Sequence, residues 1–259
     1  MPRQSLPELV LVGPENFEDC GIGCIANRRH EGFEPKVNWL RQRFDEGLRY
    51  FLFRDEAGKA LAFLEFVPGE FAWRPVDAKG WLFIHCLWVF RAGQQIGGLG
   101  SRLIQACVDE AKRQKRKGVA VQVSDGPWMA GANVYLRNGF KLVDQADRFQ
   151  LLAKPFSTKA TCKLRPTANA AADFSDGLHL VYAPQCPMLP KSVNDLTEMA
   201  AEHGLQLNVT ELKTAAAAQK APSMYGVYAL LWNGKLLADH YVSKGKFKGL
   251  LKKQILNNE

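Results

Sequence analysis

The chain has 259 residues, of which 47% are hydrophobic and 23% are charged. This length allows one large domain or two modest ones, and this composition is typical of a globular protein with an ordinary core. No apolar run approaches the ~20 residues of a membrane-spanning helix, which argues against a membrane protein. We therefore expect a cytoplasmic protein without a membrane partner.

The formal net charge of +8 includes a dense basic run at Lys112–Lys117. No aromatic residues alternate with these cations, so a nucleic-acid interface is not expected. The six cysteines lack the spacing of a zinc site, and a disulfide framework is not expected in a cytosolic chain. Two of them, Cys86 and Cys107, lie in apolar patterns and are expected in the core.

The first 157 residues predict an alternation of helices and strands that suggests a mixed sheet, with its central helix between two parallel strands. Hydrophobic periodicity and turn residues set the boundaries. In chain order we predict helix 14–24, helix 34–47, strands 49–54 and 60–67, strand 81–90, a loop over 91–100, a helix with the basic run 112–117 at its C-terminal end, strand 119–124, helix 130–138 and one or two strands within 141–152.

The centre of this region is a strand, a glycine-rich loop and a helix. The helix has one apolar face. Gly97, Gly98 and Gly100 have no Cβ, so the loop backbone can approach a ligand closely. Backbone N–H groups and a helix N-terminus both favour an anion there, and Ser101 is expected to cap the helix or to bind a phosphate. The alternative is an ordinary turn between a strand and a helix.

Two common nucleotide-binding motifs do not fit this loop. Gly98 and Gly100 have the spacing of the dinucleotide fingerprint, but Leu103 stands where the third glycine belongs. The phosphate-loop pattern fails as well, because no Gly-Lys-Ser/Thr follows. Both motifs are therefore excluded.

The segment Gln95–Gly100 matches the pattern Gln/Arg-x-x-Gly-x-Gly/Ala. It resembles the acyl-CoA loop of the GNAT N-acetyltransferases, in which loop amides bind the CoA pyrophosphate. The resemblance implies the GNAT fold (a mixed α/β sheet of the α+β type), acetyl-CoA as co-substrate and no metal. Gln95 replaces the usual basic residue, which removes one charge from that contact. The residues implied in acetyl-CoA binding are Leu87, Trp88, Val89, Gln94, Gln95, Ile96, Gly97, Gly98, Leu99, Gly100, Ser101, Asn133 and Tyr135.

The segment Tyr135–Phe140 resembles the family's Tyr-x-x-x-Gly-Phe. The resemblance implies that the Tyr135 hydroxyl protonates the departing CoA thiolate, a step worth ~10²–10⁴-fold. The alternative is a tyrosine that only packs on the sheet. Asn133 is expected either to contact the ligand or to lie on the surface.

The general base has three candidates. Glu65 lies within an apolar strand, where burial would raise the pKa of its carboxyl and suit it to accept a proton. His85 on the central strand is the second candidate. Glu70, in the loop that follows the strand of Glu65, is the third. If none serves, the amine loses its proton to water, and catalysis depends on positioning and on strand amides.

The blocks 38–48, 58–78, 86–89 and 138–156 resemble the YoaP-type acetyltransferases, which join a GNAT domain to a small C-terminal domain. After 177 the order strand, helix, strand, helix, strand, strand, helix resembles the thioredoxin fold, with a hairpin turn at Asn233–Gly234 and the last helix over 246–256. Cys186 then stands in the position of the reactive cysteine, Leu189 replaces the second cysteine, and Pro222 stands in the place of the family's cis-proline. Dithiol chemistry is excluded, which leaves a recognition module, a monothiol role for Cys186 or a scaffold.

We therefore predict a GNAT domain over 1–157, a linker over 158–176 and a YoaP-like, thioredoxin-fold domain over 177–259. The expected function is direct transfer of an acetyl group to the amine of a small molecule or peptide, in a ternary complex. The aromatic loop 71–75 and Trp128 are expected to line the acceptor cleft. The alternatives are a thiol or redox protein acting through Cys186 and a module that binds CoA without turnover, and a homodimer is left open.

Overall fold

The computed structural model describes residues 7–25, 27–167 and 171–255. The chain forms two compact units, and neither is continuous in sequence. The first unit comprises Met1–Asn27, Leu40–Ala72 and Val76–Leu164, and the second comprises Arg28–Trp39, Trp73–Pro75 and Arg165–Glu259. The predicted division at 157 and 177 differs from this arrangement, because two segments of the N-terminal half pack with the C-terminal residues.

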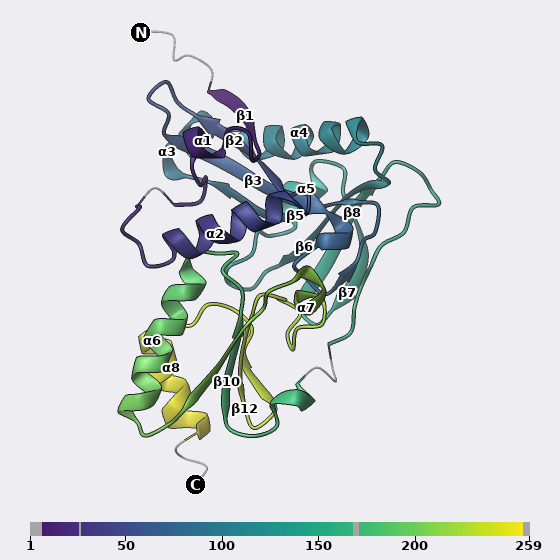
Figure 1. Cartoon of the computed structure of the whole chain (residues 1–259). Coiled ribbons are helices and arrows are strands. Elements are labelled where there is room, and N and C mark those ends of the chain that lie inside the picture. Colours follow the sequence, from purple (N-terminus) through teal and green to yellow (C-terminus); the bar gives the residue numbers. More distant parts are fainter. Residues whose placement is uncertain (1–6, 26, 168–170, 256–259) are drawn as a thin grey trace. The chain divides into compact units, whose positions relative to one another are not determined.

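The first unit is built on a seven-stranded mixed sheet with the strand order β1-β2-β3-β5-β6-β8-β7 (Figure 1). Helix α2, Phe33–Phe44, runs across the boundary between the units. The elements of the first unit are β1 (Glu8–Val12), α1 (Phe17–Cys20), β2 (Arg49–Arg54), β3 (Ala60–Pro68), β4 (Val76–Asp77), β5 (Leu82–Val89), α3 (Arg91–Ile96), α4 (Leu99–Arg113), β6 (Gly118–Ser124), α5 (Asn133–Leu136), β7 (Lys141–Ala146), β8 (Phe149–Pro155) and β9 (Lys163–Leu164).

Helix α4 covers one face of this sheet and packs on β2, β3, β5 and β6 (Figure 1). Its predicted apolar stripe is buried, because these side chains lie on one face of a 3.6-residue helix. They meet alternate residues of the strands, including Leu64, Ile84 and Val121. The buried stripe consists of Leu103, Ile104, Cys107, Val108 and Ala111.

Several sequence predictions need correction. The loop predicted over 91–100 contains helix α3, and Ser101 lies in the first turn of α4, which begins at Leu99 after Gly98. Strand β1 was not predicted, although it pairs along its length with β2. The predicted linker contains β9, which pairs with β4. Residues 168–170 of that linker lie outside the described part of the chain.

The second unit has a four-stranded sheet with the order β11-β10-β12-β13. Strand β10 pairs parallel with β11 and antiparallel with β12, and β12 pairs antiparallel with β13. The predicted order of elements is confirmed, although the predicted helix end at Leu256 lies outside the described residues. The elements are β10 (Leu178–Tyr182), α6 (Met188–Glu202), β11 (Leu207–Glu211), α7 (Ala215–Ala218), β12 (Tyr228–Trp232), β13 (Lys235–Ala238) and α8 (Lys244–Leu250).

The hairpin between β12 and β13 turns at Asn233 and Gly234, whose φ angles are 46° and 75°. Positive φ at both central residues is the conformation that Asn-Gly favours in a two-residue hairpin, so this prediction is confirmed. The expectation for Pro222 is wrong, because every peptide bond of the described residues is trans. Strand β12 begins only at Tyr228, so Pro222 lies well before the strand.

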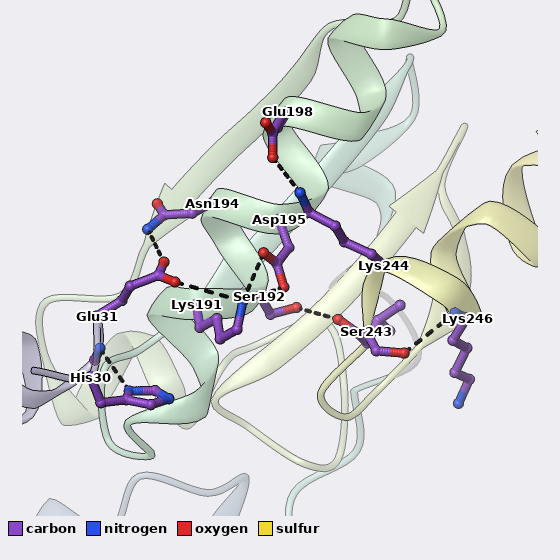
Figure 2. A network of polar contacts seen from close by, with 12 residues as sticks. His30, Glu31, Lys191, Ser192, Asn194, Asp195, Glu198, Ser243, Lys244 and Lys246 are labelled. Atoms are coloured by element: carbon purple, nitrogen blue, oxygen red, sulfur yellow. Dashed lines mark hydrogen bonds and ion pairs between the residues drawn. The ribbon is translucent and has the colours of Figure 1, made fainter. Parts of the chain in front are cut away.

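Polar contacts of α6 tie the second unit together (Figure 2). Glu31 accepts a 2.9 Å hydrogen bond from Asn194 and lies 3.6 Å from the Lys191 ammonium. Lys244 of α8 forms an ion pair with Glu198 of α6. The segment Arg28–Trp39 is therefore bound to this unit through specific side chains as well as through backbone packing.

Within the described residues, no helix combines the length and the apolar character that crossing a bilayer requires.

Candidate active site

Strands β5 and β6 are neighbours in the sheet, but they pair over only part of their length. The paired residues are Leu82 with Val119, Phe83 with Ala120, and Ile84 with Val121. Strand β5 then continues to Val89 on the edge of β3, and β6 continues to Ser124 on the edge of β8. The facing edges of β5 and β6 therefore leave the ladder in the middle of the sheet, where an extended ligand can use their backbone groups.

A β-bulge lies where the two strands part. Glu65 pairs with Cys86, and Phe66 pairs with Ile84, so His85 is the extra residue on β5. A bulge breaks the alternation of a strand and re-aims the side chain that it carries. The bulge thus sets the direction of His85 at the start of the separated segment.

The same bulge brings two of the predicted base candidates together. The Nδ1 atom of His85 lies 3.4 Å from Oε1 of Glu65, and their side chains are 0% and 4% exposed. Tyr50 also lies near this pair. Burial is the largest cause of the raised pKa of its phenol, and electrostatic interactions with Cys20, Cys24 and Glu65 raise the pKa further. A carboxylate–imidazole pair in a buried setting is suited to accept a proton.

Tyr135 extends from the short helix α5 into the core beneath α4 and is 1% exposed. Its ring packs edge-on against Phe140, with 5.6 Å between ring centroids. Burial raises the pKa of the Tyr135 hydroxyl, with smaller contributions from Cys86 and Cys107. The hydroxyl is therefore held in its protonated form and lies within electrostatic reach of Cys86 on β5.

Cys86 itself requires a correction. It was expected in the core with Cys107, and Cys107 is indeed buried, but Cys86 is exposed. Beyond Ile84, strand β5 has lost β6 as its neighbour, so the residues that follow lie at an open edge. Trp88, two residues further on, is 57% exposed for the same reason.

The glycine-rich turn, Gly97 and Gly98, lies between α3 and α4. Gly97 and Gly98 have φ angles of 74° and 67°, and a Cβ built on either would meet no atom within 4 Å. The backbone therefore requires glycine here, while the space above the turn is open. Gln94 fastens α3 to the strand by donating a 3.2 Å hydrogen bond to the Val89 carbonyl.

The other predicted residues around this turn have distinct environments. Leu99 is buried in the core, so only its backbone is available to a ligand. Ser101 is exposed, and its hydroxyl accepts a 3.0 Å hydrogen bond from the Asn138 amide instead of capping the helix. Gln94, Gln95, Ile96 and Asn133 are exposed.

Comparison with known proteins identifies the family. Residues 19–140 match the acetyltransferase (GNAT) family, and residues 206–248 match the family described as YoaP-like. The chain contains a GNAT-family N-acetyltransferase domain. The uncharacterized N-acetyltransferase YoaP of Bacillus subtilis (strain 168) is 28% identical over 247 residues, which cover 93% of this chain and 96% of that protein.

Two solved structures are also similar. The Campylobacter jejuni N-acetyltransferase PseH, in complex with acetyl coenzyme A, is 16% identical, with 59% of this chain and 100% of that chain covered and a TM-score of 0.41. Escherichia coli YhbS, a GNAT-family N-acetyltransferase in complex with CoA, is 16% identical, with 61% and 89% covered and a TM-score of 0.41. The predicted family, enzyme class and mixed α/β fold are confirmed by the family matches.

Some predicted residues lie elsewhere in the GNAT domain or have a different environment. Glu70 forms an ion pair with Arg116 and accepts a hydrogen bond from the Gly80 amide. Burial acts to raise the pKa of Glu70, but backbone hydrogen bonds and Arg116 outweigh it, so the pKa is lowered. A lowered pKa makes Glu70 a poorer base. Trp73 is fully buried, whereas Trp128 is 49% exposed.

Sequence reasoning missed three polar residues on or beside the separated part of β6, namely Gln122, Ser124 and Arg148. The Arg148 guanidinium donates a 2.6 Å hydrogen bond through Nη1 to the Ser124 hydroxyl. Gln122 and Ser124 alternate with valines along β6, and this alternation could have singled them out. Arg148 had no such signal, since only the pairing of β8 with β6 brings it there.

Cys186 occupies the turn before α6 in the second unit, as predicted, and is half-buried. Its carbonyl accepts a 3.0 Å hydrogen bond from the Leu189 amide. The following residue is closely packed: a Cβ on Gly32 would lie 1.7 Å from the Pro187 carbonyl oxygen. The segment Arg28–Trp39 therefore covers the backbone beside this cysteine.

Proposed function

We propose that this protein transfers the acetyl group of acetyl-CoA directly to the amine of a small molecule or peptide, in a ternary complex. The observation that supports this most is the separation of β5 from β6 beside the buried Glu65–His85 pair. The arrangement offers an extended slot, a candidate base and a candidate acid in one domain. The family match gives the type of reaction.

In this proposal the turn from Gln94 to Ser101 binds the CoA pyrophosphate. The 15-residue helix α4 begins there, so its N-terminal amides and dipole favour the anion. Leu99 contributes its backbone, and Asn133 lies on the exposed side of α5. The pantetheine arm and the thioester then lie along the backbone of Leu87, Trp88 and Val89, where β5 has left the β6 ladder.

The proposed reaction needs two proton transfers, one from the amine and one to the CoA thiolate. The amine nitrogen attacks the thioester carbonyl and forms the amide bond as the carbon–sulfur bond breaks. The Glu65–His85 pair accepts the proton that the amine loses, directly or through one water, and Glu65 stabilises the imidazolium that forms. Tyr135 donates its proton to the CoA thiolate, a role for which its raised pKa keeps it protonated.

For the second unit we propose a thioredoxin-like fold, because strand β10 pairs parallel with β11 and antiparallel with β12. A second candidate function uses Cys186, whose place before the 15-residue helix α6 favours a thiolate. Replacing Cys186→Ser separates the two functions. Acetyl transfer is expected to stay within about twofold of wild type, whereas any thiol-dependent activity would be lost.

The first test is isothermal titration of the full chain with acetyl-CoA, for the wild type, Gly98→Glu and Gly98→Gln. Both variants place a side chain at the same positive φ, so they share the backbone strain and differ by one charge. We expect micromolar binding by the wild type, a loss of about 100-fold or more in Gly98→Glu, and a loss several-fold smaller in Gly98→Gln. Absence of wild-type binding would contradict the proposal.

The remaining parts of the proposal concern the setting of the enzyme. We infer a cytoplasmic enzyme that acts without nucleic acid, membrane or metal. A homodimer is the alternative to a monomer, and light scattering of the purified chain decides between them.

A further inference from the structure

A row of polar side chains crosses the sheet of the GNAT domain on the face opposite α4. On β6, Val121 and Val123 belong to the core beneath α4. Because strand side chains alternate, Gln122 and Ser124 lie on the other face. The same alternation on β3, where Leu64 and Phe66 belong to that core, places Glu65 on this other face as well.

Burial makes this row unusual. Gln122 is 5% exposed and Ser124 is 3% exposed, and the Glu65 and His85 side chains are almost completely buried. A buried polar group costs free energy unless it has hydrogen-bond partners, and apolar residues fill the equivalent places on the α4 face. The polar residues of β6 occur in the segment that has left β5, which is where the proposed reaction takes place.

A fixed positive charge ends the row. Arg148 lies in the turn between β7 and β8, and the pairing of Ser124 with Phe149 brings this turn to the end of β6. The guanidinium donates to the Ser124 hydroxyl at 2.6 Å and stacks over the Phe149 ring at 4.2 Å. A Cβ on Gly126 would lie 2.2 Å from Arg148 Nη1, so the guanidinium rests directly on the backbone of this glycine.

We propose that Ser124 and Arg148 form an anion subsite that binds a carboxylate of the acceptor. This inference rests on the proposed function, and it specifies the substrate class. The planar guanidinium fork matches a carboxylate with two parallel hydrogen bonds. The Glu65–His85 pair receives the proton of the amine at one end of the row, and Arg148 holds the carboxylate at the other end.

The spacing along β6 gives the displacement from the point where β5 and β6 part, in register with Ile84 beside His85, to the anion subsite. Pairing with β5 ends at Val121, and Ser124 lies three residues further along a strand that rises ~3.3 Å per residue, a distance of about 10 Å. An α-amino acid, whose amine and carboxylate share one carbon, is too short for this span. The acceptor is therefore a short peptide or an ω-amino acid, both of which separate the two groups by several bonds.

The test compares matched acceptors at saturating acetyl-CoA. Triglycine is paired with triglycinamide, and 6-aminohexanoate with 6-aminohexanamide, and the release of CoA thiol is followed. We expect the acid of at least one pair to be used with a kcat/KM about 10-fold or more above its amide, as a charge-assisted bond provides. In Arg148→Met this preference falls to within about twofold, and Arg148→Lys retains part of it. The pair that shows the preference for the acid indicates whether the acceptor is a peptide or an ω-amino acid.

Three further measurements keep the result interpretable. Arg41→Gln removes one positive charge from a different ion pair, with Glu18, and is expected to keep the full preference. Circular dichroism shows whether Arg148→Met is folded. Titration of CoA-saturated protein with N-acetyl-6-aminohexanoate and with its amide needs no turnover, and tighter binding of the acid is expected.

The subsite is overturned if both members of each pair behave alike in rate and binding, or if neither member is used or bound. It is also overturned if Arg148→Met keeps the preference. Failure of the proposed function would be seen separately, as an absence of acetyl-CoA binding by the wild type.

Discussion

The two sheets of this protein differ in how completely they use their backbone hydrogen bonds. In the GNAT domain, β5 pairs with β6 at only three positions before the strands part. In the second unit, β10 pairs over Leu178–Tyr182 with both β11 and β12. The first arrangement leaves backbone groups for a ligand, whereas the second uses them within the sheet. An open ladder inside a sheet is a candidate ligand site because its backbone N–H and C=O groups need partners.

The two units also differ in how much space surrounds a loop. Gly97 and Gly98, at the turn of the GNAT domain, have open space above them. In the second unit, the loop that precedes β12 is buried, and Arg74 packs over its Tyr225 ring at 4.8 Å. The Arg74 guanidinium also donates a 2.7 Å hydrogen bond to Gln185. The segment Trp73–Pro75 is thus held against this loop by side-chain contacts of Arg74.

The largest effect is expected from removing the candidate base beside the separated segments of β5 and β6. In the double variant Glu65→Gln/His85→Gln, kcat is expected to fall by about 10³-fold, the middle of the range for general acid–base catalysis. Acetyl-CoA affinity should remain, since the pyrophosphate turn is untouched. Single variants should each lose nearly as much, because the two groups act as a unit. A double variant within about tenfold of wild-type kcat, with acceptor at saturation, would contradict the assignment.

The candidate acid comes next in size. In Tyr135→Phe we expect kcat to fall by about 10²-fold, with acetyl-CoA binding unchanged. Burial raises the Tyr135 pKa, so the protonated form that the reaction needs is lost only at higher pH than for an ordinary tyrosine. The pH–rate profile of the wild type should therefore show no loss from this group up to about pH 9. An unchanged kcat in the variant would leave Tyr135 as a packing residue.

The close packing of Gly32 on the Pro187 backbone, in the second unit, can be tested by adding a Cβ. Gly32→Ala places a Cβ 1.7 Å from the Pro187 carbonyl oxygen, and overpacking of this kind costs about 1–3 kcal/mol. Urea unfolding should show this loss while acetyl-CoA binding persists. The matched control is Gly249→Ala in helix α8 of the same unit, where a Cβ meets no atom within 4 Å. That change should be neutral or stabilising by up to about 1 kcal/mol, and equal effects would contradict the close packing.

The smallest expected effect concerns Glu70. Glu70→Gln removes a partly exposed ion pair with Arg116, which is worth about 0.2–1 kcal/mol. The folded-state pKa of Glu70 lies below its usual value, so this stabilisation is present at neutral pH and disappears as the pH falls through the acidic range. Thermal melts at neutral and acidic pH measure the difference. A large loss of kcat in this variant would instead support Glu70 as the general base.

Local sequence determined much of both units. The apolar stripe of α4 follows a 3.6-residue period, the strand before it is a continuous apolar run, and Asn233–Gly234 specifies its hairpin turn. The glycines of the turn were recognised as well, because glycine is needed where φ is positive, but the predicted loop over 91–100 was too long, since α3 occupies Arg91–Ile96. Each of these features depends on residues that are close together in the chain.

Tertiary structure alone decided the features that depend on strand register. The contact of Glu65 with His85 needs a one-residue bulge in β5, and the hydrogen bond of Arg148 to Ser124 needs the pairing of β8 with β6. The exposure of Cys86, which looked like a core residue, follows from the loss of β6 as a neighbour. Register is set by contacts between distant segments, and a shift of one residue turns a side chain to the other face, so the pattern of one strand does not encode it.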